Sequence, residues 1–274
     1  MSCGIISAGA ELNMDIDEQI NREIGIHGRE WNAMHDGYFA DAVIARPFIE
    51  AIMRHLSGCH ADLIVDLGGG TGFILQELIV SGLDAQVMPV NLDGSTTQLD
   101  AMKKNGIACI NRLISDFTRR DLADESKRIF FIMRSVLHYF GRDGLAPVLR
   151  HIRRQARAGE IFIHQTACFE NETDAQCINF LYQAMHTPKW YPTVGELKER
   201  LSEAHWEVID EHPAPPLKLS SAELGRRYGL NMPMMESISR KLLDQFGNID
   251  HVFQHGENEF VAHLHYRIFA VRAI

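Results

Sequence analysis

From residue 62 onward, short apolar runs alternate with longer segments whose apolar residues recur at helical spacing. We predict strands at the short runs and helices at the longer segments. Such alternation is typical of an α/β fold in which helices connect parallel strands. The predicted strands cover 62–67, 85–92, 107–115, 128–134 and 160–168, and the predicted helices cover 72–82, 96–106 and 144–159.

The two ends of the chain follow a different pattern. Residues 1–58 are predicted to form an N-terminal helical cap, with Pro47 marking a break or a helix start. Residues 59–274 are predicted to form the main domain, whose last strand covers 263–274. The segment at about 213–260 is too long for a hairpin loop and is predicted to be a helical insertion before that strand.

Composition narrows the class of protein. The chain has 274 residues, 46% hydrophobic and 23% charged, which suits a globular protein with one large domain. A formal net charge of −9 disfavours a nucleic-acid partner, and no segment has the apolar length of a membrane span. Five scattered cysteines and the lack of a signal-peptide pattern favour a cytoplasmic location. The sequence is compatible with a homodimer.

The first predicted strand runs into the glycine-rich segment LIVDLGGGTGF. Ligands bind at the carboxyl ends of strands in open α/β sheets, and glycines there let a ligand approach the backbone. The segment lacks the lysine of a phosphate-binding P-loop, and neither Gly nor Ala fills the last position of the dinucleotide fingerprint. It spells instead D-x-G-x-G-x-G, at Asp66, Gly68, Gly70 and Gly72, with Gly69 as an additional glycine.

This pattern resembles the first motif of the class I methyltransferases that use S-adenosylmethionine (SAM). SAM carries an ammonium, a sulfonium and a ribose diol but no phosphate, which suits an acidic residue ahead of the glycines. The resemblance implies a doubly wound, mostly parallel, seven-stranded Rossmann-like sheet, with SAM as the cofactor and S-adenosylhomocysteine as its product. It also implies that Asp66 orients the methionine part and that the four glycines belong to the cofactor site.

After the second strand, VNLDGS offers two positions for holding the ribose. In the family, an acidic residue here accepts hydrogen bonds from the ribose hydroxyls. One form of the motif puts it at Asn91, where an amide only partly replaces a carboxylate. The form found in plant-type O-methyltransferases puts it at Asp93. We expect Asp93, with Gly94 beside it, to bind the ribose; the alternative is a solvated turn aspartate.

After the third strand, ISDFTRR supplies an aspartate followed by an aromatic residue. The corresponding pair in the family holds the adenine by its amino group and its face. The resemblance therefore implies that Asp116 and Phe117 bind adenine, since aromatic stacking on a base is favourable. Considered alone, the two residues are equally compatible with a helix N-cap and a core phenylalanine.

The segment IMRSVLHYFGRDG resembles the part of the small-molecule, plant-type O-methyltransferases in which a basic residue precedes V-L-H. The resemblance puts Arg134 in the cofactor site and His138 at the position of a general base that deprotonates a hydroxyl. The family's next residue, an aspartate, is Tyr139 here. Other class I enzymes carry V-L-H without using the histidine as a base, so His138 is either a base or part of the cleft wall.

The sequence therefore predicts a methyltransferase that acts on a small molecule, with oxygen favoured as the acceptor. A SAM-binding protein without transfer activity and an RNA or protein methyltransferase are the alternatives. No metal is expected, because H-E-x-x-H and paired cysteines are absent from the sequence. Thiol chemistry is conceivable but lacks a nearby basic residue at Cys168 or Cys177. Several aromatic residues either cover the ligands or pack in the core: Trp31, Tyr38, Phe39, Trp190 and Tyr191.

Overall fold

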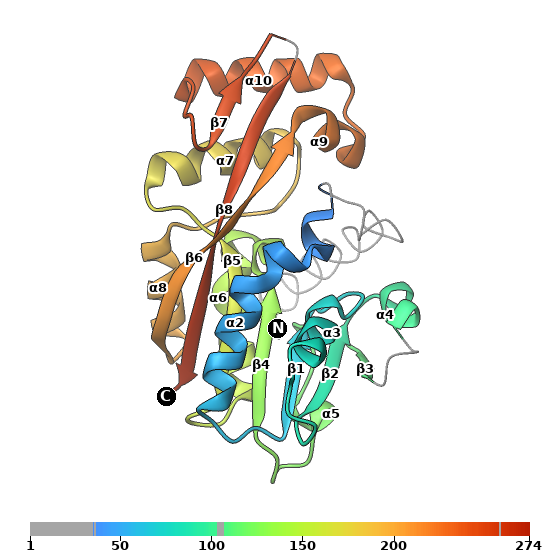
Figure 1. Ribbon diagram of the computed structural model, residues 1–274. Helices are drawn as coiled ribbons and strands as arrows, with labels where there is room; N and C mark the ends of the chain where they lie inside the picture. Colours follow the sequence, from blue (N-terminus) through green and yellow to red (C-terminus); the bar gives the residue numbers. More distant parts are fainter. Residues whose placement is uncertain (1–34, 36, 103–106, 258) are drawn as a thin grey trace, which may run out of the picture.

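The computed structural model describes residues 35, 37–102, 107–257 and 259–274 (Figure 1). In this part of the chain eight strands form one sheet. They are β1 (Leu63–Leu67), β2 (Met88–Asp93), β3 (Ala108–Asn111), β4 (Ile129–Arg134), β5 (Ile161–Ala167), β6 (Trp206–Ser220), β7 (Phe253–His255) and β8 (Phe260–Ala273). The helices are α2 (Ala42–Ser57), α3 (Phe73–Val80), α4 (Thr96–Met102), α5 (Arg119–Leu122), α6 (Gly141–Gln155), α7 (Glu172–Ala184), α8 (Val194–Glu203), α9 (Ser221–Tyr228) and α10 (Met232–Phe246).

The strand order is β3-β2-β1-β4-β5-β8-β6, and β7 pairs with β8 beside this path. Strands β1 to β5 are parallel, whereas β8 is antiparallel to both β5 and β6. From β1 the chain builds outward to β2 and β3, and then crosses back to β4 on the other side. This reversal leaves a crevice at the carboxyl ends of β1 and β4, where open α/β sheets bind ligands.

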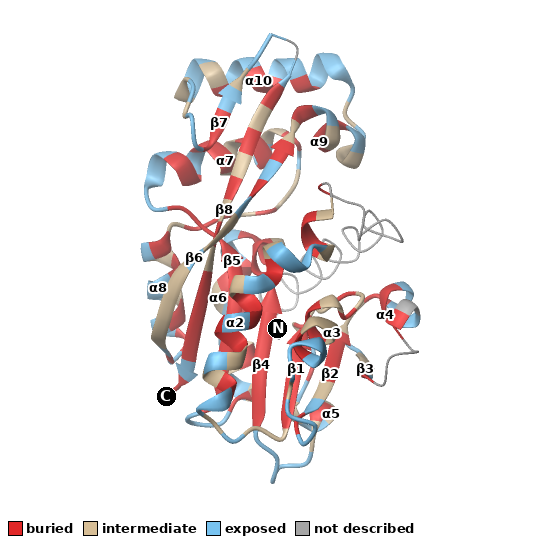
Figure 2. Ribbon diagram, in the orientation of Figure 1, coloured by how far each residue is buried: buried red, intermediate tan, exposed pale blue. Residues whose placement is uncertain are grey.

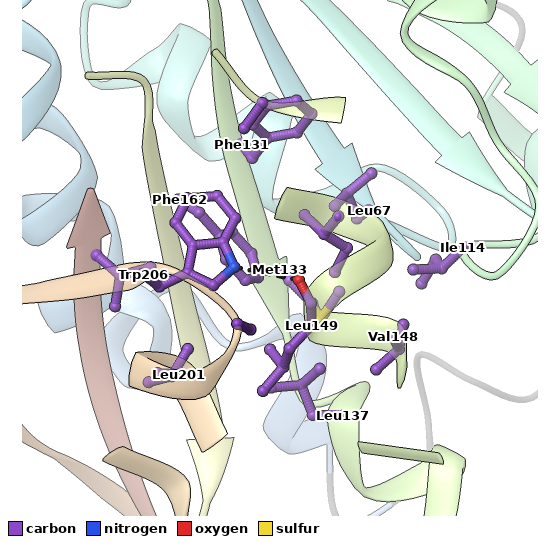
Figure 3. Packing of buried hydrophobic residues seen from close by; sticks show 14 of the residues in the cluster. Leu67, Ile114, Phe131, Met133, Leu137, Val148, Leu149, Phe162, Leu201 and Trp206 are labelled. Carbon is purple, nitrogen blue, oxygen red and sulfur yellow. Dashed lines mark hydrogen bonds between the residues drawn. The ribbon is translucent and has the colours of Figure 1, made fainter. Parts of the chain in front are cut away.

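The central strands β1 and β4 are buried along their whole length because helices cover both faces of the sheet (Figure 2). On one face, Phe131 and Phe162 pack against α6 and α8 (Figure 3). Trp206, at the start of β6, joins this cluster and donates its indole N–H to the carbonyl of Leu149 at 3.2 Å. On the other face, Ile64 packs with α2 and α3. The predicted α/β class with a doubly wound, mostly parallel sheet is confirmed. The described sheet has eight strands where seven were expected, because the short β7 pairs with β8 beside the seven-stranded path.

Strands β6 and β8 continue well beyond the rest of the sheet (Figure 1). Their far ends, with β7, α7, α9 and α10, surround a separate apolar cluster that includes Leu181, Leu242 and Leu264. We call this part the distal half, and the remaining sheet with its covering helices the sheet half. Tyr38 and Phe39, just before α2, also belong to the distal cluster, so the segment preceding α2 connects the two halves.

Two predicted boundaries differ from the structure. The insertion predicted at about 213–260 is helical only in α9 and α10, because β6 extends through Ser220 and β7 and β8 occupy its end. Within the predicted N-terminal cap, α2 covers the sheet rather than capping it: its buried Phe48 and Ile52 pack on the strands. Pro47 lies inside α2, whose start is fixed instead by the Asp41 side chain accepting hydrogen bonds from two backbone N–H groups.

Candidate functional site

A cavity opens at the carboxyl ends of β1, β2 and β4, at the point where the strand order reverses. Backbone and short side chains after β1 and β2 form one side, and the turn after β4 forms the other. The lining residues are Gly68, Gly70, Asp93, Gly94, Ser95, Gln98, Leu113, Ile114, Arg134, Ser135, Val136, Tyr139 and Phe140. The glycine motif, the second acidic position and the predicted basic residue thus meet in one place.

The turn after β1 requires glycine for reasons of space as well as conformation. A Cβ atom on Gly69 would lie 2.3 Å from Asn91 Oδ1 and 2.6 Å from the Asp66 carboxyl carbon. Gly72 has a φ of +73°, and a Cβ there would lie 2.0 Å from the Met102 sulfur. The turn therefore packs tightly on β2 and α4. This packing presents the backbone of the turn to the cavity.

The two candidates for holding a ribose have different surroundings. Asn91 is fully buried, and its amide N–H₂ donates to the Gly70 carbonyl at 2.8 Å. Asp93 lines the cavity and accepts hydrogen bonds from Gly70 N at 2.8 Å and Ser95 N at 2.7 Å. Burial raises the pKa of the Asp93 carboxyl, while these two N–H groups oppose the rise. Asn91 is thus part of the scaffold of the turn, and Asp93 faces the ligand space.

Asp66, in β1, is buried beneath the glycine turn and is 1% exposed. Its Oδ2 has no hydrogen-bond partner among the described residues. Burial and the nearby charge of Asp93 raise the pKa of Asp66 to about 7, and the positive charge of Arg134 acts in the opposite direction. A carboxylate in this state would gain strongly from a cation placed beside it.

Arg134 ends β4, and Ser135 follows it, at the opposite side of the cavity. Arg134 is 8% exposed; its guanidinium donates to the Phe39 carbonyl at 3.2 Å and lies 5.5 Å from the centre of the Tyr38 ring. Ser135 has a φ of +61°, which is strained for a residue with a side chain. Its hydroxyl pairs with the Tyr266 hydroxyl at 2.7 Å. Both residues are thereby tied to the segment before α2 and to β8.

His138 and Tyr139 are neighbours in the 3₁₀ turn Leu137–Phe140, but they face different surroundings. Tyr139 lines the cavity. The His138 ring is 6% exposed and stacks on Tyr191 with 5.2 Å between ring centres. It is not among the cavity-lining residues and lies beside the Tyr139 ring, at 4.1 Å between centres. His138 therefore stands one side chain behind the cavity wall.

A lysine approaches Tyr139 from the loop between α7 and α8. The Lys189 ammonium is 4.7 Å from the centre of the Tyr139 ring and donates to the Tyr228 hydroxyl at 2.6 Å. Its side chain is buried in spite of its charge. Arg227, beside Tyr228 in α9, contacts His35 Nε2 at 2.8 Å. Polar and aromatic side chains of the distal half thus reach the edge of the cavity.

No family model matches the chain, and no curated protein matches it in sequence. Solved structures do match it in fold. A putative methyltransferase of Bacillus halodurans C-125 is 13% identical, with a TM-score of 0.62, over 82% of this chain and 97% of its own. The 1,6-didemethyltoxoflavin-N1-methyltransferase of Burkholderia thailandensis, with bound 1,6-didemethyltoxoflavin and S-adenosylhomocysteine, is 14% identical, with a TM-score of 0.52, over 100% and 93%. The geranyl diphosphate C-methyltransferase of Streptomyces coelicolor A3(2), in complex with Mg²⁺, geranyl diphosphate and S-adenosylhomocysteine, is 13% identical, with a TM-score of 0.52, over 84% and 79%. The chain has the class I methyltransferase fold.

Within this fold, the structure does not bring the predicted adenine pair to the cavity. Phe117 is fully buried in the core cluster beneath α6, with its ring edge against His151. Asp116 is exposed, and neither residue lines the cavity. Leu113 and Ile114, a few positions earlier, line it instead.

Sequence reasoning also missed Gln98, Ser135 and Tyr139 as lining residues. Ser135 and Tyr139 directly follow β4 at the switch point of the class I methyltransferase fold, and that position was a usable signal. Gln98 lies in the first turns of α4, where the sequence alone gives no sign of which face is turned to the cavity. Of the predicted aromatic residues, Trp31 lies outside the described residues.

Other chemistry is less well supported in the part of the chain that the structure describes. Burial raises the pKa of both the Cys168 and the Cys177 thiol to about 12, which leaves almost no thiolate at neutral pH. The described His, Cys, Asp and Glu side chains form no group of three or more that could hold a metal ion. Among the helices described, none combines the length and apolarity needed to cross a membrane.

Proposed function

We propose that the chain binds SAM in the cavity at the ends of β1, β2 and β4 and transfers its methyl group to a small molecule. The observation that carries this proposal is a glycine turn and the Asp93 carboxylate at one cavity in a class I methyltransferase fold, with Asp66 buried beneath that turn and its Oδ2 without a hydrogen-bond partner among the described residues. SAM, when bound, supplies an electrophilic methyl group attached to a sulfonium.

The described residues fit this cofactor. Asp66 Oδ2 meets no hydrogen-bond donor in the part of the chain that the structure describes, and an ammonium group would supply one and lower the raised pKa of Asp66. Asp93 has oxygen lone pairs left after its two backbone hydrogen bonds, so it can accept from ribose hydroxyls. The cradle formed by Gly68, Gly70 and Gly94 allows close contact with the backbone.

The residues after β4 are the proposed acceptor side. Val136 and Phe140 offer apolar walls that exclude water, and Tyr139 separates the cavity from Lys189. Most of the rate enhancement would come from holding the acceptor in line with the methyl group and the sulfur of SAM, and from excluding water. For an oxygen acceptor, His138 is proposed to take the hydroxyl proton. Because the His138 ring lies behind the Tyr139 side chain, the proton must reach His138 past Tyr139.

A small-molecule acceptor is also supported by neighbours in fold, since two of them carry bound geranyl diphosphate and 1,6-didemethyltoxoflavin. The net charge of −9 disfavours an RNA substrate. We further propose a cytoplasmic location, because the described cysteines are all free thiols, two of them fully buried.

A second candidate is a SAM-binding protein without transfer activity. The observation in its favour is the position of His138, which stacks on Tyr191 and stays off the cavity surface. The two candidates separate in one assay: incubation of the protein with SAM carrying a labelled methyl group and a cell-extract fraction of small molecules. Label in a small-molecule product supports the enzyme. Tight SAM binding with no label transferred to small molecules, RNA or protein supports the second candidate.

A further inference from the structure

Among the described side chains that line the cavity, Gln98 in α4 has a buried oxygen without a hydrogen-bond partner. Its side chain is 8% exposed, and its Oε1 meets no hydrogen-bond donor among the described residues. A buried amide oxygen without a donor costs roughly 1–3 kcal/mol, so it marks a place where a ligand can supply one.

The position of Gln98 is fixed relative to Asp93. The Asp93 carboxylate accepts from Ser95 N at 2.7 Å, and the Ser95 hydroxyl accepts from Gln98 N at 3.4 Å. On the other side, the Asn111 amide donates to the carbonyls of Asp93 and Gly94 at 3.0 Å. The loop and the first turn of α4 are therefore one braced unit, and the unpartnered oxygen is presented by a rigid support.

The proposed cofactor orientation decides which donor Gln98 meets. If the ammonium group lies at Asp66 and the ribose at Asp93, the base extends further in the same direction, past β2 toward α4. There the cavity is lined by the apolar Leu113 and Ile114 beside Gln98. Apolar side chains together with one hydrogen-bond acceptor suit adenine, whose exocyclic amino group is a donor.

We propose that Gln98 recognises the adenine amino group of the cofactor through its side-chain oxygen, and that it selects adenine over bases that carry a carbonyl there. This inference rests on the proposed function. It assigns to α4 the contact that the sequence pattern assigns to Asp116, which is exposed and outside the cavity lining.

The test compares the binding of S-adenosylhomocysteine with that of its hypoxanthine analogue, in which a carbonyl replaces the amino group. Isothermal titration is performed on the wild type, Gln98→Met and Gln98→Glu. Met keeps the length of the side chain without its oxygen, and Glu keeps the acceptor. Thermal unfolding of each variant checks that the fold is retained.

The wild type is expected to prefer the adenine ligand by about 10- to 100-fold. Gln98→Met is expected to reduce this preference to within about threefold, and Gln98→Glu to keep it above about tenfold. An unchanged preference in Gln98→Met, or an equal loss for both ligands, would overturn the role of Gln98 while leaving the proposed function intact. If the wild type binds neither ligand, the proposed function fails, and the role of Gln98 with it.

Discussion

The sheet half and the distal half contribute to the cavity in different ways. The sheet half supplies backbone atoms, glycines and short acidic side chains at strand ends. The distal half and the loop between α7 and α8 supply polar side chains such as Tyr228 and the buried Lys189, whose ammonium lies 4.7 Å from the centre of the Tyr139 ring at the cavity edge. A cofactor that is bound by backbone atoms requires one turn geometry. An acceptor that is bound by side chains can differ when the residues of the distal half differ. The comparison suggests that cofactor and acceptor recognition are separable in this chain.

The largest effect is expected at Gly69, where any side chain collides with Asn91 and Asp66. Gly69→Ala should weaken SAM binding by more than about 100-fold, because the turn must move to relieve contacts of 2.3 and 2.6 Å. Calorimetry measures the affinity. Gly195→Ala, in α8, is the matched control, since a Cβ there would contact Thr193 Oγ1 at an ordinary distance of 3.9 Å. Wild-type affinity in Gly69→Ala would show that the tight turn is not needed for the ligand.

His138 tests whether the acceptor side performs proton transfer. For an oxygen acceptor, His138→Ala should lower kcat by about 100-fold and leave SAM affinity within about threefold. Steady-state kinetics with the identified acceptor measure both. A kcat equal to that of the wild type would remove the base from the mechanism and leave positioning alone.

Lys189 tests the separation of the two halves directly. Lys189→Met should raise the KM for the acceptor or lower kcat by about tenfold, because the buried ammonium braces Tyr139 and Tyr228. SAM affinity should stay within about twofold. Lys198→Met, which removes an exposed lysine paired with Glu211, is the control. Equal losses in SAM and acceptor binding would mean that the two sites are not separable.

The sequence predicts the residues of the sheet half better than those of the distal half. The sheet half was predictable because β1, the glycines and Asp93 follow one another within a short segment, and strand ends meet in space. Lys189 and Tyr228 lie far apart in the sequence and meet because β6 extends beyond the rest of the sheet and leads into α9, whose last residue is Tyr228 (Figure 1). No local sequence pattern predicts the contact between Lys189 and Tyr228.

Asp116 and Phe117 show a second limit of sequence reasoning. Their spacing from the glycines matches the family, but the chain after β3 turns so that Phe117 enters the core. The boundary of the insertion failed for a related reason: the segment after Pro213 is rich in proline, yet it continues β6 with an irregular register between Ala214 and Leu217. Packing in the core decided the position of Phe117, and pairing with β8 decided where β6 ends.

The smallest expected effect is the pH dependence of SAM binding. The pKa of Asp66 is raised to about 7 in the unliganded protein, so below pH 7 an ammonium group must displace a proton to bind. Affinity at pH 6 should be about tenfold weaker than at pH 8, and Asp66→Asn should be weak at both. A pH-independent wild type would contradict the buried-carboxylate assignment.

The same shift has a consequence for stability. In the unfolded chain the carboxyl ionises near pH 4, so the unliganded protein should lose stability as pH rises from about 4 to 7. Asp66→Asn removes this loss and should unfold at a higher temperature than the wild type at pH 8, in the absence of SAM. Differential scanning calorimetry measures the difference.

The most direct test of the central claim is calorimetric titration of the protein with SAM, with NAD as the control ligand and Asp93→Ala as the variant. Asp84→Ala, which changes an exposed aspartate outside the cavity lining, is the matched control. We predict that SAM binds, that NAD does not, and that Asp93→Ala weakens SAM binding by about 100-fold because a charge-assisted hydrogen bond to the ribose is lost. Tighter binding of NAD than of SAM, or unchanged SAM affinity in Asp93→Ala, would contradict the assignment of this cavity.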